Sequence, residues 1–306
     1  MKINETDIVD TYAEAFSMRF TRLIVTATDE YWLGAAMDAF TGYATSVIGC
    51  DAEVGVETGL DPADTPDGRP GCAVMAFGFD GVSLAKAVVN RCGQCLMTCP
   101  TTAVYNGLET EERFDLGNKL RFFGDGYQKS KLIGEKRLWR VPVMDGEFVI
   151  EDKVGVAKGV AGGNFLILSG DQRSGLVAAR LASEATASVP GIITPFPGGV
   201  VRSGSKVGSR YKDMVASTSH AYCPTLRGRV ESKLDDSVNC VYEIVIDGAD
   251  FDAVERGTQI GIQAAAAVEG VVAISAGNYG GNLGKHKFYL HELMKKLDNQ
   301  HDEQSD

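Results

Sequence analysis

The chain has 306 residues, enough for one large domain or two ordinary ones. Its 30 Lys and Arg residues against 41 Asp and Glu give a formal net charge of -11, which excludes a general nucleic-acid or anionic-membrane surface. The N-terminus lacks the apolar core of a signal peptide, and no apolar run of about eighteen residues occurs, so no membrane span is expected. The odd number of cysteines, 7, favours a cytoplasmic protein with reduced thiols.

The first half of the chain alternates predicted strands with predicted helices. Residues 22–28 are rich in β-branched side chains and predict a buried strand. Asp29 is suited to cap the helix that follows, and Gly42 to end it. The elements expected after it are a strand at 45–50, a turn at 65–71, a strand at 72–79, a helix at 81–90 and a strand at 94–99.

The second half repeats this order of elements. Those expected are a strand at 164–169, a helix capped by Asp171 and ending near 188, a strand at 191–196, a strand at 240–246, a helix at 250–267 and a strand at 271–275. Four strand–helix–strand units in two pairs predict an α+β fold of two ferredoxin-like (βαββαβ) lobes, with antiparallel sheets and the helices on one face. We place the N-terminal lobe at 1–146 and the C-terminal lobe at 147–306.

A basic, glycine-rich stretch runs from Pro195 to Lys212, within a region that has no acidic residue between Glu184 and Asp213. Its glycines let the backbone approach a ligand closely, its serines add hydroxyl donors, and its cations locally reverse the charge of the chain. These residues are Gly198, Gly199, Gly204, Gly208, Ser203, Ser205, Ser209, Arg202, Lys206, Arg210 and Lys212. A flexible solvated loop is the alternative, but the concentrated charge favours binding of an anionic small molecule.

Glu243 is the one charged residue in the apolar strand sequence Val-Tyr-Glu-Ile-Val-Ile. Alternation places it on one face with Val241 and Val245. A carboxyl group on an apolar face has its pKa raised by desolvation, which suits proton transfer near neutral pH. The alternatives are a glutamate on an edge strand that discourages aggregation, or a partner for a nearby arginine. The pattern alone leaves these interpretations open.

Three other motifs have structural as well as functional interpretations. Residues 92–100 fall one cysteine short of a bacterial ferredoxin run, so buried structural thiols are favoured over an iron–sulfur cluster, and no metal site is expected. Asp125, in the turn at 121–127, fits a hairpin, although the aromatic residues around it could stack on a heterocycle. The glycine-rich loop at 276–285 lacks P-loop spacing and is either a turn or a pocket wall.

Several segments together resemble the family of formylmethanofuran:tetrahydromethanopterin formyltransferases, over nearly the full length. The matching segments are 10–16, 65–71, 93–101, 122–126, 142–148, 195–210, 223–226, 241–248 and 275–281. Residues 22–26 and 138–142 look more like the methylotrophic-bacterial branch than the methanogen one. The resemblance implies transfer of a formyl group between the amine of methanofuran and N5 of tetrahydromethanopterin. It also implies a cytoplasmic homotetramer of two-lobed chains, with active sites near subunit contacts and no bound metal or prosthetic group.

The implied chemistry gives roles to the residues singled out above. Glu243 matches the family's strand glutamate and is the expected general acid/base for a tetrahedral intermediate. Residues expected to bind an anionic tail or the oxyanion are Gly198, Gly199, Arg202, Ser205, Lys206 and Arg210. Residues expected to hydrogen-bond the pterin or the furan arm are Asp125 and Asn278.

Two rival functions remain open from the sequence. One is the same transfer performed by a subunit of a bacterial formyltransferase/hydrolase complex, whose partners release the formyl group as formate. The other is a pterin-binding protein without turnover. The first predicts purification with a metal-dependent amidohydrolase-like subunit, and the second predicts pterin binding without formyl exchange.

Overall fold

The computed structural model describes residues 1–303, which form two compact units. The terminal unit combines Met1–Ser17 with the chain from Val160 onward, and the central unit is Met18–Gly159. These units divide at 17/18 and 159/160, whereas the lobe boundary placed between residues 146 and 147 stays a prediction. Within residues 1–303, no helix has both the length and the apolar character needed to cross a membrane.

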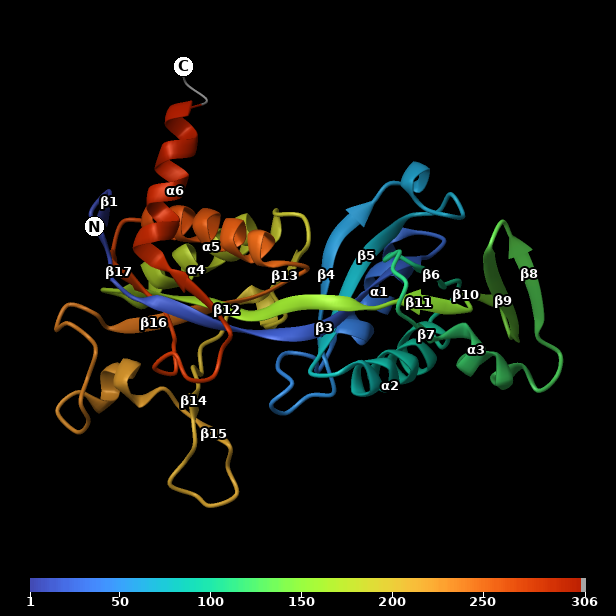
Figure 1. The fold of residues 1–306 in the computed structure, drawn as a ribbon, viewed down its shortest axis with the longest axis horizontal. Coiled ribbons are helices and arrows are strands. Elements are labelled where there is room, and N and C mark those ends of the chain that lie inside the picture. The colour runs from blue at the N-terminus through green and yellow to red at the C-terminus, as the bar shows by residue number, and fades with distance from the viewer. Residues whose placement is uncertain (304–306) are drawn as a thin grey trace. The chain divides into compact units, whose positions relative to one another are not determined.

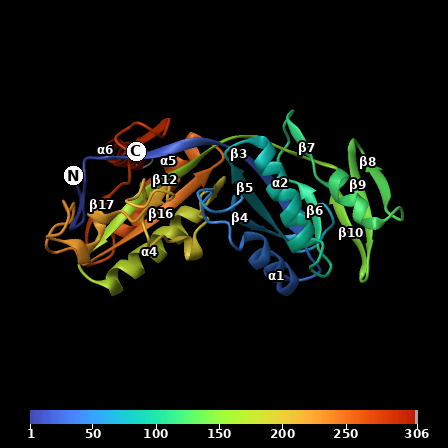
Figure 2. The same ribbon diagram turned by 90° about the horizontal axis from the view of Figure 1, so that it is seen from below.

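The central unit contains one βαββαβ motif. Its elements are the second half of β3 (Tyr12–Thr26), α1 (Glu30–Thr41), β4 (Glu53–Leu60), β5 (Gly71–Gly78), α2 (Gly81–Arg91) and β6 (Ala103–Asn106). The strands lie in the antiparallel order β4-β5-β3-β6, and α1 and α2 cover one face (Figure 2). Asp29 caps α1 by accepting from the Trp32 N–H, and Gly42 ends it. This lobe is ferredoxin-like, as predicted.

The central sheet continues beyond β6. The further elements are η1 (Pro62–Asp64), the π-turn η2 (Cys92–Leu96), β7 (Arg113–Asp115), α3 (Gly117–Leu120), η3 (Arg121–Gly124), β8 (Lys129–Ile133), β9 (Lys136–Val143), β10 (Gly146–Glu151) and β11 (Lys153–Gly155). β10 pairs with β6 in parallel and with β9 in antiparallel, and β8 follows β9 as the outermost strand. β7 and β11 form a separate two-stranded sheet.

The predicted turn at 65–71 is held by a network of half-buried polar contacts. Arg69 donates from Nη2 to Thr26 Oγ1 at 2.9 Å and from Nη1 to the Thr101 carbonyl at 2.5 Å. Asp67 accepts from Thr26 Oγ1 at 2.8 Å and from the Tyr105 hydroxyl at 3.0 Å. The motif therefore ties the entry of β5 to β3 and β6, which is a structural role.

The terminal unit contains the second βαββαβ motif, in the order β13-β16-β12-β17. Its elements are β12 (Ala157–Ser169), α4 (Gln172–Ala187), β13 (Ile192–Ile193), β16 (Cys240–Gly248), α5 (Phe251–Ala266) and β17 (Val271–Ser275). Asp171 caps α4 as predicted, and Asp250 caps α5. α4 and α5 cover one face of the sheet, packing on Tyr242, Ile244 and Ile246 (Figure 1).

Segments from both chain ends complete this unit. They are β1 (Lys2–Ile3), β2 (Thr6–Ile8), the first half of β3, β18 (His286–Tyr289) and α6 (Leu290–Glu303). β2 pairs with β17 in parallel, and β18 pairs with residues 12–15 of β3 in antiparallel. η4 (Pro197–Gly199) lies against α4. The chain then passes to the uncovered face of the sheet, which carries β14 (Lys206–Val207), β15 (Ala216–Ser217), η5 (His220–Tyr222) and η6 (Pro224–Leu226).

Three predicted strands are wrong in whole or in part. Residues 94–99 continue α2 as a π-turn, closed by the bond from the Met97 N–H to the Cys92 carbonyl at 2.9 Å. Residues 45–50 form a turn, in which the Ser46 carbonyl accepts from the Gly49 N–H at 3.0 Å and from the Cys50 N–H at 2.8 Å. The strand at 191–196 shrinks to Ile192–Ile193, where the chain bends into η4.

Candidate active site

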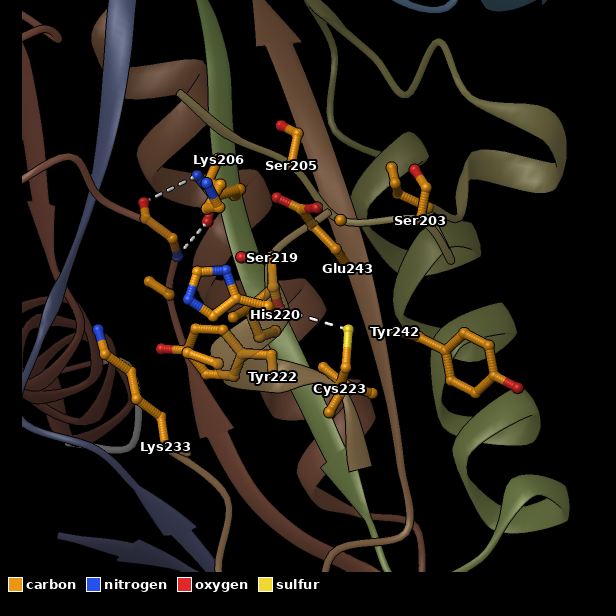
Figure 3. A pocket seen from close by; sticks show the side chains of 18 of the residues that line it. Ser203, Ser205, Lys206, Ser219, His220, Tyr222, Cys223, Lys233, Tyr242 and Glu243 are labelled. Carbon is orange, nitrogen blue, oxygen red and sulfur yellow. Dashed lines mark hydrogen bonds between the residues drawn. The ribbon is translucent and has the colours of Figure 1, made fainter. Parts of the chain in front are cut away.

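The candidate site lies on the face of the terminal sheet opposite α4 and α5. Glu243 of β16 points to this face, while its neighbour Tyr242 points toward α4 (Figure 3). Val201 forms a two-bond bridge with Glu243, its N–H donating to the Glu243 carbonyl at 2.8 Å and its carbonyl accepting at 2.9 Å. The bridge fixes the basic stretch beside Glu243, so the residues after Val201 cross over its side chain.

These elements enclose a cavity of about 230 Å³. One wall carries Arg202, Ser203, Ser205 and Lys206, and another carries His220, Tyr222, Cys223 and Lys233. The floor is formed by Asn164, Leu166 and Glu243, and the remaining wall by residues 276–279. The volume is below the ~300–1,000 Å³ typical of pockets for whole ligands, so the cavity suits the reacting end of a long substrate.

Glu243 is half-buried, and the pKa of its carboxyl is strongly shifted. Burial raises its pKa from 4.5 to about 7, because the ionised form loses its hydration. Glu243 is paired on both sides, with β12 on one side and with Val201 on the other. Glu243 therefore does not lie on an edge strand. Within residues 1–303, no ion pair with an arginine involves Glu243. The edge strand and the arginine partner are thus not observed, and the role of proton carrier stays a prediction.

The glycine-rich loop after β17 is fixed by side-chain amides. Asn164 accepts from the Gly277 N–H at 2.6 Å and donates to the Gly277 carbonyl at 3.1 Å. The Asn278 amide donates to the Tyr12 carbonyl at 3.1 Å and to Thr11 Oγ1 at 3.3 Å. The Asn278 donors are therefore used to anchor the loop, and its expected contact with substrate stays a prediction.

The structure brings five of the predicted site residues together in the walls of the cavity, namely Arg202, Ser205, Lys206, Glu243 and Asn278. Gly198 and Gly199 instead form η4, where an added Cβ at Gly199 would overlap Ser183 of α4. Arg210 is exposed in the connection between β14 and β15. Asp125 lies in the central unit in a left-handed conformation, with φ 48°. Binding roles for these four residues stay predictions.

Sequence reasoning missed the tyrosine at the centre of the loop wall. Tyr279 is half-buried and lines the cavity, as Ser205 does. An aromatic residue inside a glycine-rich loop after a strand is the signal that could have identified it. Lys233, Tyr222 and His220 come from a segment without periodicity, which gives no comparable signal.

The cysteines and other metal-binding residue types do not cluster in a metal centre within residues 1–303. Over the part of the chain that the structure describes, no group of three or more His, Cys, Asp or Glu residues is placed to hold an ion. Cys92 is fully buried in η2, where burial raises the pKa of its thiol. Burial likewise raises the pKa of Cys95 and of Cys99. Protonated thiols in apolar surroundings pack as small apolar groups.

Comparisons with known proteins match nearly the whole chain to one enzyme family. The family model for formylmethanofuran-tetrahydromethanopterin formyltransferase matches residues 1–143, and the model for the proximal lobe of this enzyme matches residues 146–293. The enzymes named formylmethanofuran–tetrahydromethanopterin formyltransferase from Methylococcus capsulatus and Archaeoglobus fulgidus are 52% and 48% identical. Each alignment covers 96% of this chain and 100% of the relative.

Two solved structures share the whole fold. The formyltransferase from Methanosarcina barkeri superposes with a TM-score of 0.91 at 46% identity, over 96% of this chain and 100% of that chain. The formyltransferase/hydrolase complex from Methylorubrum extorquens, solved with methylofuran, contains a chain with a TM-score of 0.93 at 46% identity, over 96% and 98% of the chains.

Together with the two ferredoxin-like lobes, these matches show an acyl-transfer enzyme of the formyltransferase class. The chain belongs to the formylmethanofuran–tetrahydromethanopterin formyltransferase family. The resemblance that the sequence motifs carry is thereby confirmed.

Proposed function

We propose that this chain transfers a formyl group between the amine of methanofuran and N5 of tetrahydromethanopterin, with Glu243 as the acid/base. The observation that carries the proposal is the Glu243 carboxyl, whose pKa of about 7 lets it accept and return a proton near neutral pH. Its position on the floor of a polar cavity, beneath a basic loop, supports the same conclusion.

The reaction needs one proton to move between two amines. The N5 nitrogen attacks the formamide carbon, and the carbonyl π pair moves to oxygen to give a tetrahedral oxyanion. Glu243 takes the proton from N5 and gives it to the methanofuran nitrogen as the C–N bond breaks. The carbonyl then re-forms on N5, and Glu243 is again ionised. The reverse direction uses the same steps with the two amines exchanged.

The cations around the cavity support binding of anionic substrates. Arg202, Lys206 and Lys233 contribute positive charge to two of its walls, although the chain as a whole carries -11. Both C1 carriers have anionic tails, and the cavity is large enough only for their reacting ends. We therefore expect the tails to leave the cavity along the basic stretch, with Lys206 as a point of contact.

Assembly and location belong to the same proposal. We expect a cytoplasmic homotetramer, in which a second subunit completes the binding site. The complex from Methylorubrum extorquens favours a second assembly, in which the chain is one subunit of a formyltransferase/hydrolase complex. Mass measurement of the purified protein distinguishes four identical chains from a mixed complex.

The direct test mixes 5-formyl-tetrahydromethanopterin with methanofuran and follows the absorbance of the pterin. Formyl exchange is expected for the wild-type chain, and a folded Glu243→Gln variant should lose most of it, because the amide cannot accept the proton. Full turnover in Glu243→Gln would contradict the catalytic assignment. Binding of the pterin without any exchange by the wild-type chain would favour the non-catalytic function.

A further inference from the structure

We propose that residues 208–215, the tip of the β14–β15 hairpin, dock in an acidic cleft on the central unit of a second copy of this chain. The inference rests on the homotetramer of the proposed function and names one contact that holds it together. Arg202 and Lys206, which line the cavity before the tip begins, remain available for a substrate tail.

The tip of the hairpin is an ordered and exposed apolar surface. The hairpin projects from the terminal sheet on the side away from α4 and α5 (Figure 1). Tyr211 is 74% exposed, Val215 73% and Met214 51%. The Gly208 N–H donates to the Val215 carbonyl at 2.8 Å, and the Met214 N–H donates to the Tyr211 carbonyl at 3.2 Å. Large apolar side chains exposed together on an ordered projection are typical of a protein–protein contact.

The central unit carries a cleft of about 550 Å³ between α1 and the segment that joins β4 to β5. Leu33 and Met37 of α1 form the apolar part of its lining, and Glu30, Asp61 and Asp64 supply carboxylates. Among the described residues that line it, none is Lys, Arg or His. Within residues 1–303, no ion pair involves any of the three carboxylates.

The hairpin and the cleft carry opposite charge. Residues 23–68, which supply most of the cleft, contain nine Asp and Glu and no Lys, Arg or His. Residues 202–212 contain four Lys and Arg and no Asp or Glu, although the net charge of the chain is -11. Arg210 and Lys212 flank Tyr211, so an aromatic anchor and two cations can enter the cleft together. Cations placed among the cleft carboxylates remove the repulsion between them, which favours this pairing over other surfaces of the chain.

Gly34 of α1 leaves space in the cleft for an incoming side chain. A glycine weakens a helix relative to alanine, and a Cβ added at Gly34 would meet no atom within 4 Å, so packing within the chain does not require a glycine there. Each copy of the chain carries both the hairpin and the cleft. Two copies can therefore exchange hairpins about a two-fold axis, which closes the pair and covers both surfaces.

The contact is tested by exchanging charges and measuring the mass of the purified protein by sedimentation. Arg210→Glu/Lys212→Glu and Asp61→Lys/Asp64→Lys should each lower the mass, because like charges then meet and the dissociation constant rises by about 100-fold. A chain with all four substitutions should regain the wild-type mass. Lys129→Glu/Lys131→Glu, which reverses two exposed cations of β8, is the control and should keep the wild-type mass.

Gly34→Leu tests the cleft without a change of charge. The leucine side chain occupies the cleft and should lower the mass. The midpoint of thermal unfolding should not fall, because leucine favours a helix more than glycine does. Gly49→Leu is the matched control, since a Cβ at Gly49 of the same unit also meets no atom within 4 Å, and it should keep the wild-type mass.

The possible results separate the contact from the rest of the proposed function. Wild-type mass in either charge-reversed chain or in Gly34→Leu would overturn the contact and leave the tetramer standing. Failure of the fourfold variant to recover, or an equal loss of mass in the β8 control, would also overturn the contact. A monomeric wild-type chain would overturn the tetramer as well. Formyl exchange by the wild-type chain is assayed in parallel, because its absence contradicts the proposed reaction and not the contact.

Discussion

The raised pKa of Glu243 predicts an unusual dependence of rate on pH. In either direction the attacking amine must lose its proton, so the enzyme begins each turnover with an ionised Glu243. With a pKa of about 7, about nine-tenths of the carboxyl groups are ionised at pH 8 and about one in a hundred at pH 5. The value of kcat/KM should therefore fall about 90-fold between these pH values.

A glutamate with an ordinary pKa would behave differently over the same range. At the unshifted value of 4.5, about three-quarters of the groups remain ionised at pH 5, and the rate would fall only about 1.3-fold. The difference between the two cases is nearly two orders of magnitude. It comes from the desolvation of one side chain, since this is the cause of the shift.

The assay is best run with N5 of the pterin as the attacking amine. An amine conjugated to an aromatic ring is weakly basic, so its own protonation does not produce the acid limb. Glu231→Gln, which alters an exposed carboxyl of the same unit, serves as the control and should keep the wild-type profile. If kcat/KM of the wild-type enzyme fell only around pH 4.5, the link between the burial of Glu243 and catalysis would be refuted.

The remaining predictions concern stability and substrate affinity. Glu243→Gln should stabilise the fold by about 3 kcal/mol at pH 8, because the buried carboxylate is removed, and denaturant titrations should show this gain vanishing as the pH falls from 7 toward 4.5. An equal gain at pH 4 would contradict it. Lys206→Ala should raise KM for at least one substrate several-fold, less so in high salt; unchanged KM for both would exclude the contact. Gly199→Ala should cost about 3 kcal/mol in thermal or urea unfolding, since its Cβ would overlap Ser183 at φ 73°. Gly198→Ala, at φ 61° with open space around it, is the control, at about 1 kcal/mol.

Local signals predicted the helices and the buried strands well. Asp29 and Asp171 each stand just before a segment whose apolar residues recur at helical spacing, and each caps that helix. The hydrogen bond of each cap joins residues less than four positions apart, so the local sequence is enough to predict it. The segment at 45–50 was misassigned, since its two flanks are held by a distant residue: the Arg91 guanidinium donates to the Tyr43 carbonyl before it and to the Asp51 carboxylate after it. The pairing of β2 with β17 was also missed, since it joins opposite ends of the chain.

The candidate site was predictable only in part, for the same reason. Glu243 stands out because a charge in an apolar strand breaks the local pattern. Its neighbours in space come from loops. The positions of these loops depend on the bridge between Val201 and Glu243 and on the hydrogen bonds between Asn164 and Gly277. Tyr279 acquires its setting from these contacts, which no local periodicity encodes.

The division of β3 between the two units has a consequence for synthesis on the ribosome. Its first half pairs with β18, and its second half pairs with β5 and β6. The central unit can fold as soon as residue 159 has emerged, because all its strands are then present. β2 and residues 12–15 of β3 are made early, but their partners β17 and β18 follow only when residues 271–289 have been added. A nascent chain halted before residue 271 would thus carry a finished central unit, while β2 and residues 12–15 of β3 still lack β17 and β18.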